Sequence, residues 1–225
     1  MHSSELPREI VERLTRRRGK RHIFASIDPA HSALVVIDMQ HSFVAPDAAS
    51  AVPEAREIVP NINRLAGALR AAGGAVAWVQ ATYTREGPGY WPLFFDYMVS
   101  PETSARILAG LTEGSPGHAL WHALDVHPND LRARKNRYSA FFPGASDLPQ
   151  KLQQRGIDTV LIAGTMTNVC CEASARDAMA AGFKTIVIAD ANAAHSQAEH
   201  VASLATIAQF IGDVRSTDEI IGLLK

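Results

Sequence analysis

The sequence predicts one α/β domain in three layers, a parallel sheet of about six strands with helices on both faces. Short continuous apolar runs, typical of strands buried on both faces, alternate with segments of helical periodicity. The 225 residues contain no internal repeat, low-complexity tract or linker. A chain of 24.3 kDa is expected to expose about 10,000 Å² when folded, which buries about 70% of the unfolded surface. That burial is enough for a core of its own.

Strands and helices can be placed along most of the chain. Five strands are expected at 33–37, 75–79, 130–135, 159–163 and 185–189. Helices are expected from Pro60 to the Gly73-Gly74 pair, and over 146–155, 169–181 and 197–210. Proline often opens a helix and glycine often ends one. Residues 82–125 are rich in glycine, proline and aromatic residues, so we expect an irregular active-site wall or lid there.

Charge and hydropathy exclude several classes of protein. The 22 Lys and Arg residues against 23 Asp and Glu give a formal charge of −1, which argues against a nucleic-acid binder. The longest apolar runs are far shorter than the 18 or more residues of a membrane span, so no membrane contact is expected. No basic–apolar–small signal opens the chain, and we therefore expect a cytoplasmic protein.

Residues 1–30 form a basic N-terminal arm or helix ahead of the domain at 31–225. Five basic residues are concentrated there, namely Arg16, Arg17, Arg18, Lys20 and Arg21. The arm either contacts an anion or is a solvated arm or helix that packs on a neighbouring subunit. The second interpretation is favoured, because the rest of the chain offers no basic stripe for an anionic partner.

Three reactive side chains are expected at the carboxyl edge of the sheet, where open parallel sheets bind ligands. Asp38 follows the first strand, Lys135 ends the third, and Cys170 follows the fourth and begins a helix. Taken one at a time, each also fits an ordinary structural role. Asp38 fits an aspartate in a turn, Lys135 a solvated base and Cys170 a small buried side chain. Together they predict acyl transfer, because a carboxylate can take the thiol proton and a lysine offsets negative charge. Helix N-terminal N–H groups would stabilise a thiolate or an oxyanion, and an activated thiol is expected to have a depressed pKa. The neighbouring Cys171 is expected to be buried and unreactive.

Three ordered motifs resemble the isochorismatase-like cysteine hydrolases: Val-Ile-Asp-Met-Gln around Asp38, Arg-Tyr-Ser-Ala-Phe-Phe after Lys135, and Gly-Thr-Met-Thr-Asn-Val before Cys170. The resemblance extends from about residue 28 to 214. It implies a Rossmann-like sheet and a catalytic triad of Asp38, Lys135 and Cys170. It also implies a cis peptide between Thr165 and Met166, which directs the Met166 N–H toward the oxyanion beside that of Cys170.

The cysteine indicates the branch of the family. Members that cleave a vinyl ether lack it, so the resemblance implies hydrolysis of a C–N bond through a thioester. The chain most resembles the ureidoacrylate and N-carbamoylsarcosine amidohydrolases, which implies a small amide or ureido substrate. Vinyl-ether hydrolysis by Asp38 alone and a non-catalytic binding module of the same fold are the alternatives.

No metal or other cofactor is expected. Nicotinamidases carry an Asp-x-His metal motif after the second strand, where this chain reads Gln80-Ala81-Thr82. Three histidines in the irregular stretch, His118, His122 and His127, match no known zinc spacing. By analogy with the family, a homo-oligomer (dimer or tetramer) is expected.

Residues for substrate binding are less clearly indicated. The candidates are Phe43, Tyr83, Tyr138, Phe141 and Asn168. Other aromatic residues either line a planar pocket or belong to the core: Tyr90, Trp91, Phe94, Phe95 and Trp121. Three arginines either hold a substrate carboxylate or are ordinary surface and helix charges: Arg85, Arg137 and Arg176.

Overall fold

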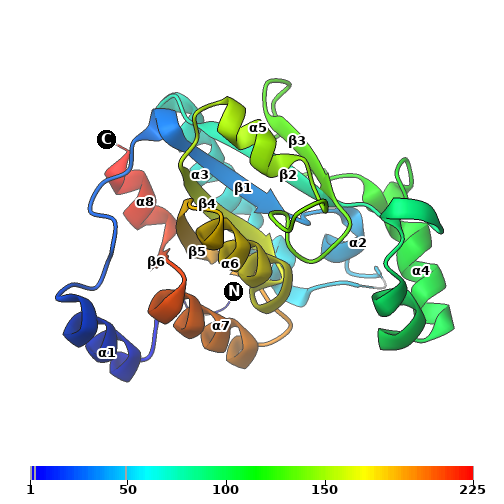
Figure 1. Cartoon of the computed structure of the whole chain (residues 1–225), viewed down its shortest axis with the longest axis horizontal. Helices are drawn as coiled ribbons and strands as arrows, with labels where there is room; N and C mark the ends of the chain where they lie inside the picture. Colours follow the sequence, from blue (N-terminus) through cyan, green and yellow to red (C-terminus); the bar gives the residue numbers. More distant parts are fainter. Residues whose placement is uncertain (1, 3, 49, 225) are drawn as a thin grey trace.

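The computed structural model describes residues 2, 4–48 and 50–224, and contains one six-stranded sheet (Figure 1). The order is β3-β2-β1-β4-β5-β6, and every neighbouring pair is parallel. The strands are β1 (Ser32–Ile37), β2 (Ala75–Ala81), β3 (Leu131–Lys135), β4 (Thr159–Thr165), β5 (Lys184–Ala193) and β6 (Asp213–Arg215). The predicted fold class is confirmed. The structure adds β6, which the sequence pattern did not locate.

Helices cover both faces of the sheet (Figure 1). One face carries α1 (Arg8–Arg18), α5 (Leu148–Gln154), α6 (Glu172–Ala180) and α7 (Gln197–Phe210). The other carries α3 (Val59–Ala71) and α8 (Thr217–Leu223). The remaining helices are α2 (His41–Val44) and α4 (Pro101–Leu111), with short 3₁₀ turns at Pro29–His31, Pro53–Arg56, Gly87–Gly89 and Pro116–His118. Among the described residues, no helix is long and apolar enough to cross a membrane.

Strand β1 lies in the middle of the sheet and shows how the core divides. Ala33, Val35 and Ile37 contribute to the hydrophobic cluster on one face, whereas Leu34 and Val36 contribute to the cluster on the other. This alternation is the period of two that a strand imposes on its side chains. Because both faces are covered, the strand is apolar from Ala33 to Ile37, which is the signal that identified it. The accessible surface of 10080 Å² agrees with the value expected from the mass.

The expectation that residues 82–125 are irregular is wrong for part of that stretch. It contains helix α4 and a π-helical turn, η4 (Leu93–Met98). Ser100 caps α4 by accepting a hydrogen bond from the Thr103 N–H, and Leu108 and Leu111 are buried on its inner side. This capping serine and apolar spacing are ordinary helix signals. In Figure 1, α4 lies at one end of the molecule, beyond the strands.

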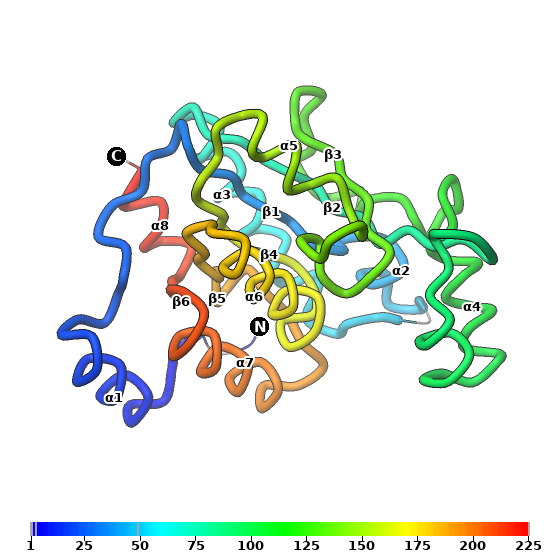
Figure 2. Tube along the Cα trace, viewed as in Figure 1, coloured from blue at the N-terminus to red at the C-terminus, as the bar shows by residue number. Residues whose placement is uncertain are grey.

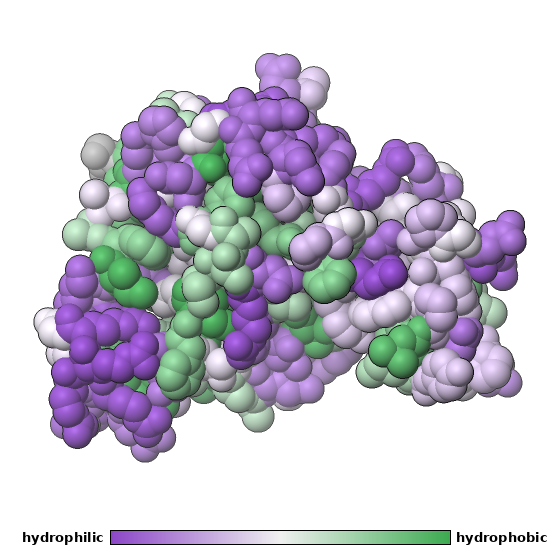
Figure 3. Space-filling model, in the orientation of Figure 1, coloured by the Kyte–Doolittle hydropathy of each residue, from purple (hydrophilic) through white to green (hydrophobic). Residues whose placement is uncertain are grey.

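The basic arm has a partner within the chain. Helix α1 buries Ile10 and Leu14 in the core. Its Arg17 donates to the Gln209 carbonyl at the end of α7 (2.6 Å) and lies over the Phe210 ring. Cations are favourable at a helix C-terminus, so these contacts account for much of the basic cluster. Figure 2 shows the chain running from α1 along the side of the domain to β1, and Figure 3 shows the hydrophilic surface over α1.

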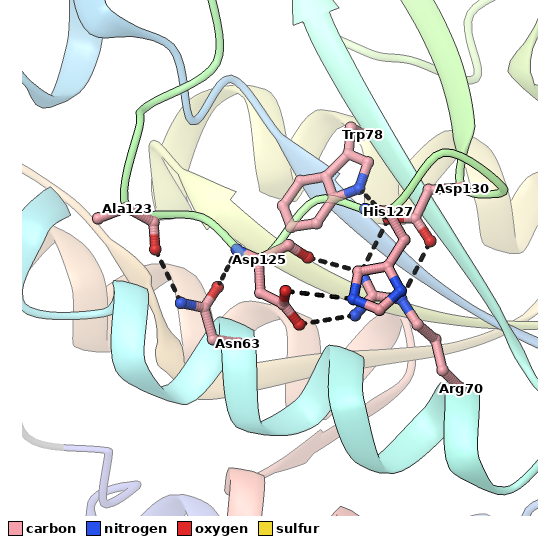
Figure 4. Close-up of polar contacts among 7 residues, drawn as sticks. All are labelled: Asn63, Arg70, Trp78, Ala123, Asp125, His127 and Asp130. Atoms are coloured by element: carbon pink, nitrogen blue, oxygen red, sulfur yellow. Dashed lines mark hydrogen bonds and ion pairs between the residues drawn. The ribbon is translucent and has the colours of Figure 1, made fainter.

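A cluster of polar side chains holds the segment that leads into β3 (Figure 4). Asp130 precedes β3 and binds the Arg70 side chain from α3, while its Oδ2 also accepts from the indole N–H of Trp78 in β2. Arg70 donates as well to Asp125, whose other oxygen contacts His127. The cluster therefore fixes the start of β3, the strand that ends in Lys135.

Candidate active site

Asp38 is placed by a sharp turn at the carboxyl end of β1. Its φ is +55°, a left-handed conformation that aspartate tolerates better than most residues. Its N–H donates to the Val79 carbonyl (2.9 Å) and its carbonyl accepts from the Thr165 hydroxyl (3.3 Å). The side chain is 1% exposed. These bonds to β2 and β4 fix the carboxylate between the two neighbouring strands.

Gly164 allows the cysteine turn to approach Asp38. Its φ is +118°, and a Cβ at this position would lie 2.1 Å from the Ile37 carbonyl oxygen of β1. Any other residue would push β4 away from β1 at the point where Asp38 begins. The peptide bond between Thr165 and Met166 is cis, at the position that the resemblance implies.

Lys135 links the two other reactive groups. It ends β3, in register with Ala81 of β2, and its side chain is fully buried. Its Nζ lies 2.8 Å from Asp38 Oδ2 and donates to Cys170 Sγ (3.4 Å) and the Arg137 carbonyl (3.1 Å). The ammonium group therefore pairs with one carboxylate and donates to two further acceptors. The sequence placed these three residues at one edge, and the structure brings them into contact.

Cys170 lies in a π-helical turn, η6 (Thr167–Cys171), and not at the start of the following helix. Helix α6 begins at Glu172, two residues after the predicted nucleophile. The turn is closed by bonds from the Val169 and Cys171 N–H groups to the Met166 carbonyl, both 3.1 Å. Cys171 is fully buried, whereas Cys170 reaches a cavity.

Burial dominates the electrostatics of the site. It raises the pKa of Asp38, and the charge of Lys135 offsets this only in part. Burial, with the negative charge of Asp38, raises the pKa of the Cys170 thiol to about 12 despite Lys135. Burial would lower the pKa of Lys135, but the negative charge of Asp38 acts against burial and the pKa is raised. The expected depressed thiol pKa is therefore wrong. The thiol is neutral near pH 7, and its proton has to move as sulfur attacks.

The cavity in front of Cys170 has a volume of about 340 Å³ and is lined mainly by apolar side chains. Three of the five predicted substrate-binding residues line it, namely Phe43, Tyr83 and Tyr138. The other two do not. Phe141 is buried in the core with its ring edge against Phe183, and Asn168 is half-buried in the cysteine turn. Of the other aromatic candidates Phe94 lines the cavity, whereas Phe95 is buried behind it.

None of the three candidate arginines lines this cavity. Arg176 pairs with Glu172 on α6 (2.7 Å), and the Arg137 guanidinium lies 5.3 Å from the Trp91 ring centroid. Arg85 is exposed. In the parts of the chain that the structure describes, no group of three His, Cys, Asp or Glu residues is arranged to hold a metal.

Sequence reasoning missed three residues that shape the site. Gln40, two residues after Asp38, is fully buried and exchanges hydrogen bonds with both backbone groups of Ala81. His200 of α7 bonds the Thr167 hydroxyl (2.8 Å) at the start of the cysteine turn. His195 lines the cavity and is exposed. A histidine at the carboxyl end of a strand is a recognisable signal, but the predicted strand stopped at 189 and β5 continues to Ala193.

Comparison with known proteins places the site in a family. The isochorismatase domain family matches residues 32–219. The ureidoacrylate amidohydrolase RutB of Methylobacterium radiotolerans is 33% identical over 217 residues, covering 88% of this chain and 82% of that protein. A cysteine hydrolase structure from Pseudomonas syringae pv. phaseolicola has a TM-score of 0.82 at 31% identity, covering 91% of this chain and 97% of its own.

The fold recurs in N-carbamoylsarcosine amidase from Thermoplasma acidophilum, with a TM-score of 0.68 at 24% identity. That match covers 84% of this chain and 98% of the amidase. The family match, the curated relative and the shared fold confirm the resemblance that the three sequence motifs indicated. The chain belongs to the isochorismatase family, with the cysteine hydrolases.

Proposed function

We propose that this protein is a cysteine-dependent amidohydrolase that cleaves the C–N bond of a small amide or ureido compound through a thioester. The observation that carries the proposal is the Lys135 ammonium, which contacts Asp38 Oδ2 (2.8 Å) and Cys170 Sγ (3.4 Å) together. A base, a cation and a nucleophile in mutual contact beside a cavity form an acyl-transfer site. The named activity of the relative RutB supports the same class of reaction.

The raised thiol pKa determines the order of the proton transfers. Asp38 accepts the thiol proton as Sγ attacks the substrate carbonyl, and Lys135 offsets the negative charge. The backbone N–H groups of Met166 and Cys170 hold the oxyanion of the tetrahedral intermediate. Asp38 then gives the proton to the departing nitrogen, which leaves as an amine or ammonia. Water attacks the thioester with Asp38 again as base, releasing the acid and restoring the thiol.

Removing the nucleophile tests this proposal. Cys170→Ala and Cys170→Ser variants are screened for ammonia release from small amides, carbamoyl amino acids and ureido acids. We expect at least about a 1,000-fold loss of turnover, as for the removal of other catalytic nucleophiles. Circular dichroism checks the fold. Normal turnover in Cys170→Ala would overturn the proposal, and dependence on Asp38 alone would favour vinyl-ether chemistry.

The expected homo-oligomer and the division at residue 30 are part of the same proposal. Light scattering on the purified protein measures the first. The second is tested by asking whether a chain that begins at residue 31 keeps its fold and activity. The contacts of Ile10, Leu14 and Arg17 with the domain predict a loss of stability on removal of the arm.

A further inference from the structure

We infer that the substrate enters the cavity as a neutral molecule with an apolar, planar group beside its amide, and that amides bearing a carboxylate are disfavoured. This rests on the proposed function, because it names the substrate class of the same site. It is drawn from the chemistry of the cavity walls and from the fixed positions of the charges around them.

The walls are aromatic and mutually supported. Tyr83 and Phe94 both line the cavity, and each packs edge-on against the buried Phe95, with ring centroids 5.1 and 5.0 Å apart. Tyr138 lines another part and contacts Phe94 (6.0 Å) and Trp91 (4.8 Å). Rings that pack against one another in this way offer flat, apolar surfaces on which a planar group packs.

Among the described residues, no lysine or arginine lines this cavity to bind a carboxylate. The Lys135 ammonium is fully buried, pairs with the Asp38 carboxylate, donates to Cys170 and the Arg137 carbonyl, and is not part of the cavity lining. The candidate arginines lie outside the cavity. His195 lines the cavity but is exposed, where water screens any charge.

Asp38 makes the cavity unfavourable for an anion. It lines the cavity next to Cys170, and a carboxylate that entered would lose its hydration while facing another carboxylate. A neutral amide has no such cost, and its apolar part gains from burial. The inference separates this chain from its relative RutB, whose name specifies a carboxylate-bearing ureido compound.

Matched pairs of amides test the inference. Benzamide is compared with 4-carboxybenzamide, and butyramide with succinamate, by ammonia release from the wild-type protein at pH 7.5. We expect kcat/KM to be at least about tenfold higher for the neutral member of each pair, because one unpaired charge is desolvated in the other. Equal or higher values for the carboxylates would overturn the inference. A carboxylate preference that disappears in His195→Gln would assign His195 as an anion site and overturn it too.

Two variants on one helical turn test the role of the walls. Phe94→Ala removes a wall residue, and Tyr97→Ala changes a residue that is 80% exposed on the same turn. The first is expected to raise KM for benzamide at least fivefold and to affect butyramide less, whereas the second should leave both unchanged. Equal effects of Phe94→Ala on both substrates would contradict a planar subsite.

Binding to Cys170→Ser, measured by calorimetry, separates this inference from the proposed function. If no pair is hydrolysed by the wild-type protein but the variant still binds the neutral members more tightly, the function fails and the inference stands. If hydrolysis occurs with a preference for carboxylates, the function stands and the inference fails. Absence of binding by every neutral member at millimolar concentration also overturns the inference.

Discussion

Asp38 and Asp130 are both buried beside a cation, but their carboxylates are surrounded differently. Asp130 Oδ2 accepts from Arg70 Nη2 (2.8 Å), Trp78 Nε1 (2.7 Å) and the His127 N–H (2.8 Å), and Oδ1 accepts from Arg70 Nε (3.0 Å). Asp38 forms an ion pair with the Lys135 ammonium at 2.8 Å and lies beside the Cys170 thiol, but among the described residues neither of its side-chain oxygens accepts a well-formed hydrogen bond. The first carboxylate is held by fixed donors, and the second faces a group that can give it a proton.

The two pKa values diverge for this reason. Burial acts to raise both. At Asp130, the donors from Arg70, Trp78 and His127 outweigh burial and lower the pKa, so the group stays ionised and holds the structure together. At Asp38, burial prevails and the pKa is raised. A carboxylate whose lone pairs are occupied is a poor base, whereas one with a raised pKa can accept a proton in a reaction. The two aspartates therefore differ in their well-formed hydrogen bonds, which Asp130 accepts from Arg70, Trp78 and His127 and which Asp38 lacks among the described residues.

The largest expected effect is on activity, in Asp38→Asn. An amide in place of the carboxylate cannot accept the thiol proton, so kcat/KM should fall by about 100- to 10,000-fold. The negative charge of Asp38 also raises the thiol pKa, and its removal should lower that pKa. Iodoacetamide should therefore label Cys170 faster in Asp38→Asn than in the wild-type protein at pH 7, as measured by intact mass.

In Asp38→Asn turnover should fall while labelling of Cys170 rises. Unfolding also exposes the thiol, so labelling is compared with that of Cys171, which is fully buried in the fold. Labelling of Cys170 alone, together with lost turnover, fits the role of Asp38 as base. Slower labelling with retained turnover would remove the distinction between Asp38 and Asp130.

Asp130→Asn should affect stability instead of activity. Its amide cannot accept from all of the Arg70, Trp78 and His127 donors, and Arg70 loses a buried charge partner. The free energy of unfolding in urea should fall by about 3 kcal/mol, as for other broken buried pairs. While the variant is folded, kcat should remain within about twofold of the wild-type value, since the site is elsewhere.

Asp218→Asn is the matched control for that variant. Asp218 also pairs with an arginine, Arg64, but its side chain is 78% exposed. Its loss should cost less than about 1 kcal/mol, because exposed ion pairs are screened by water. If Asp130→Asn lost catalytic activity in the folded state to the extent of Asp38→Asn, the proposed division of roles would be wrong.

Local patterns in the sequence were enough to predict the sheet and the reactive residues. Continuous apolar runs at 33–37 and 159–163 mark strands buried on both faces, and parallel strands bring their carboxyl ends to one edge. Asp38 and Cys170 follow such strands, and Lys135 ends the edge strand β3, so their contact is a consequence of topology. The family resemblance added the position of the cis peptide.

What the sequence could not show depends on contacts between distant residues. The cavity walls require Phe94, Tyr83 and Tyr138 to meet from three segments, and spacing along the chain carries no sign of this. Phe141 looks equivalent to its neighbours in the motif but points into the core. The raised thiol pKa likewise depends on burial, which a motif does not report. The sequence shows that the arm is basic, but it does not show that the arm binds α7, which lies about 190 residues away along the chain.

The smallest effect expected is a separation of activity from stability on the acid side. Only ionised Asp38 accepts the thiol proton, so kcat/KM should fall about tenfold per pH unit below the pKa of this group, which burial raises above its ordinary value. The lowered pKa of Asp130 acts the other way: its contribution to stability is present above the unfolded value and is lost only as pH falls through the lowered one. Between these limits the protein should be folded but inactive. The measurement is kcat/KM and the free energy of unfolding in urea over the same range of pH. If activity is lost at the same acid pH as the fold, the two aspartates titrate together.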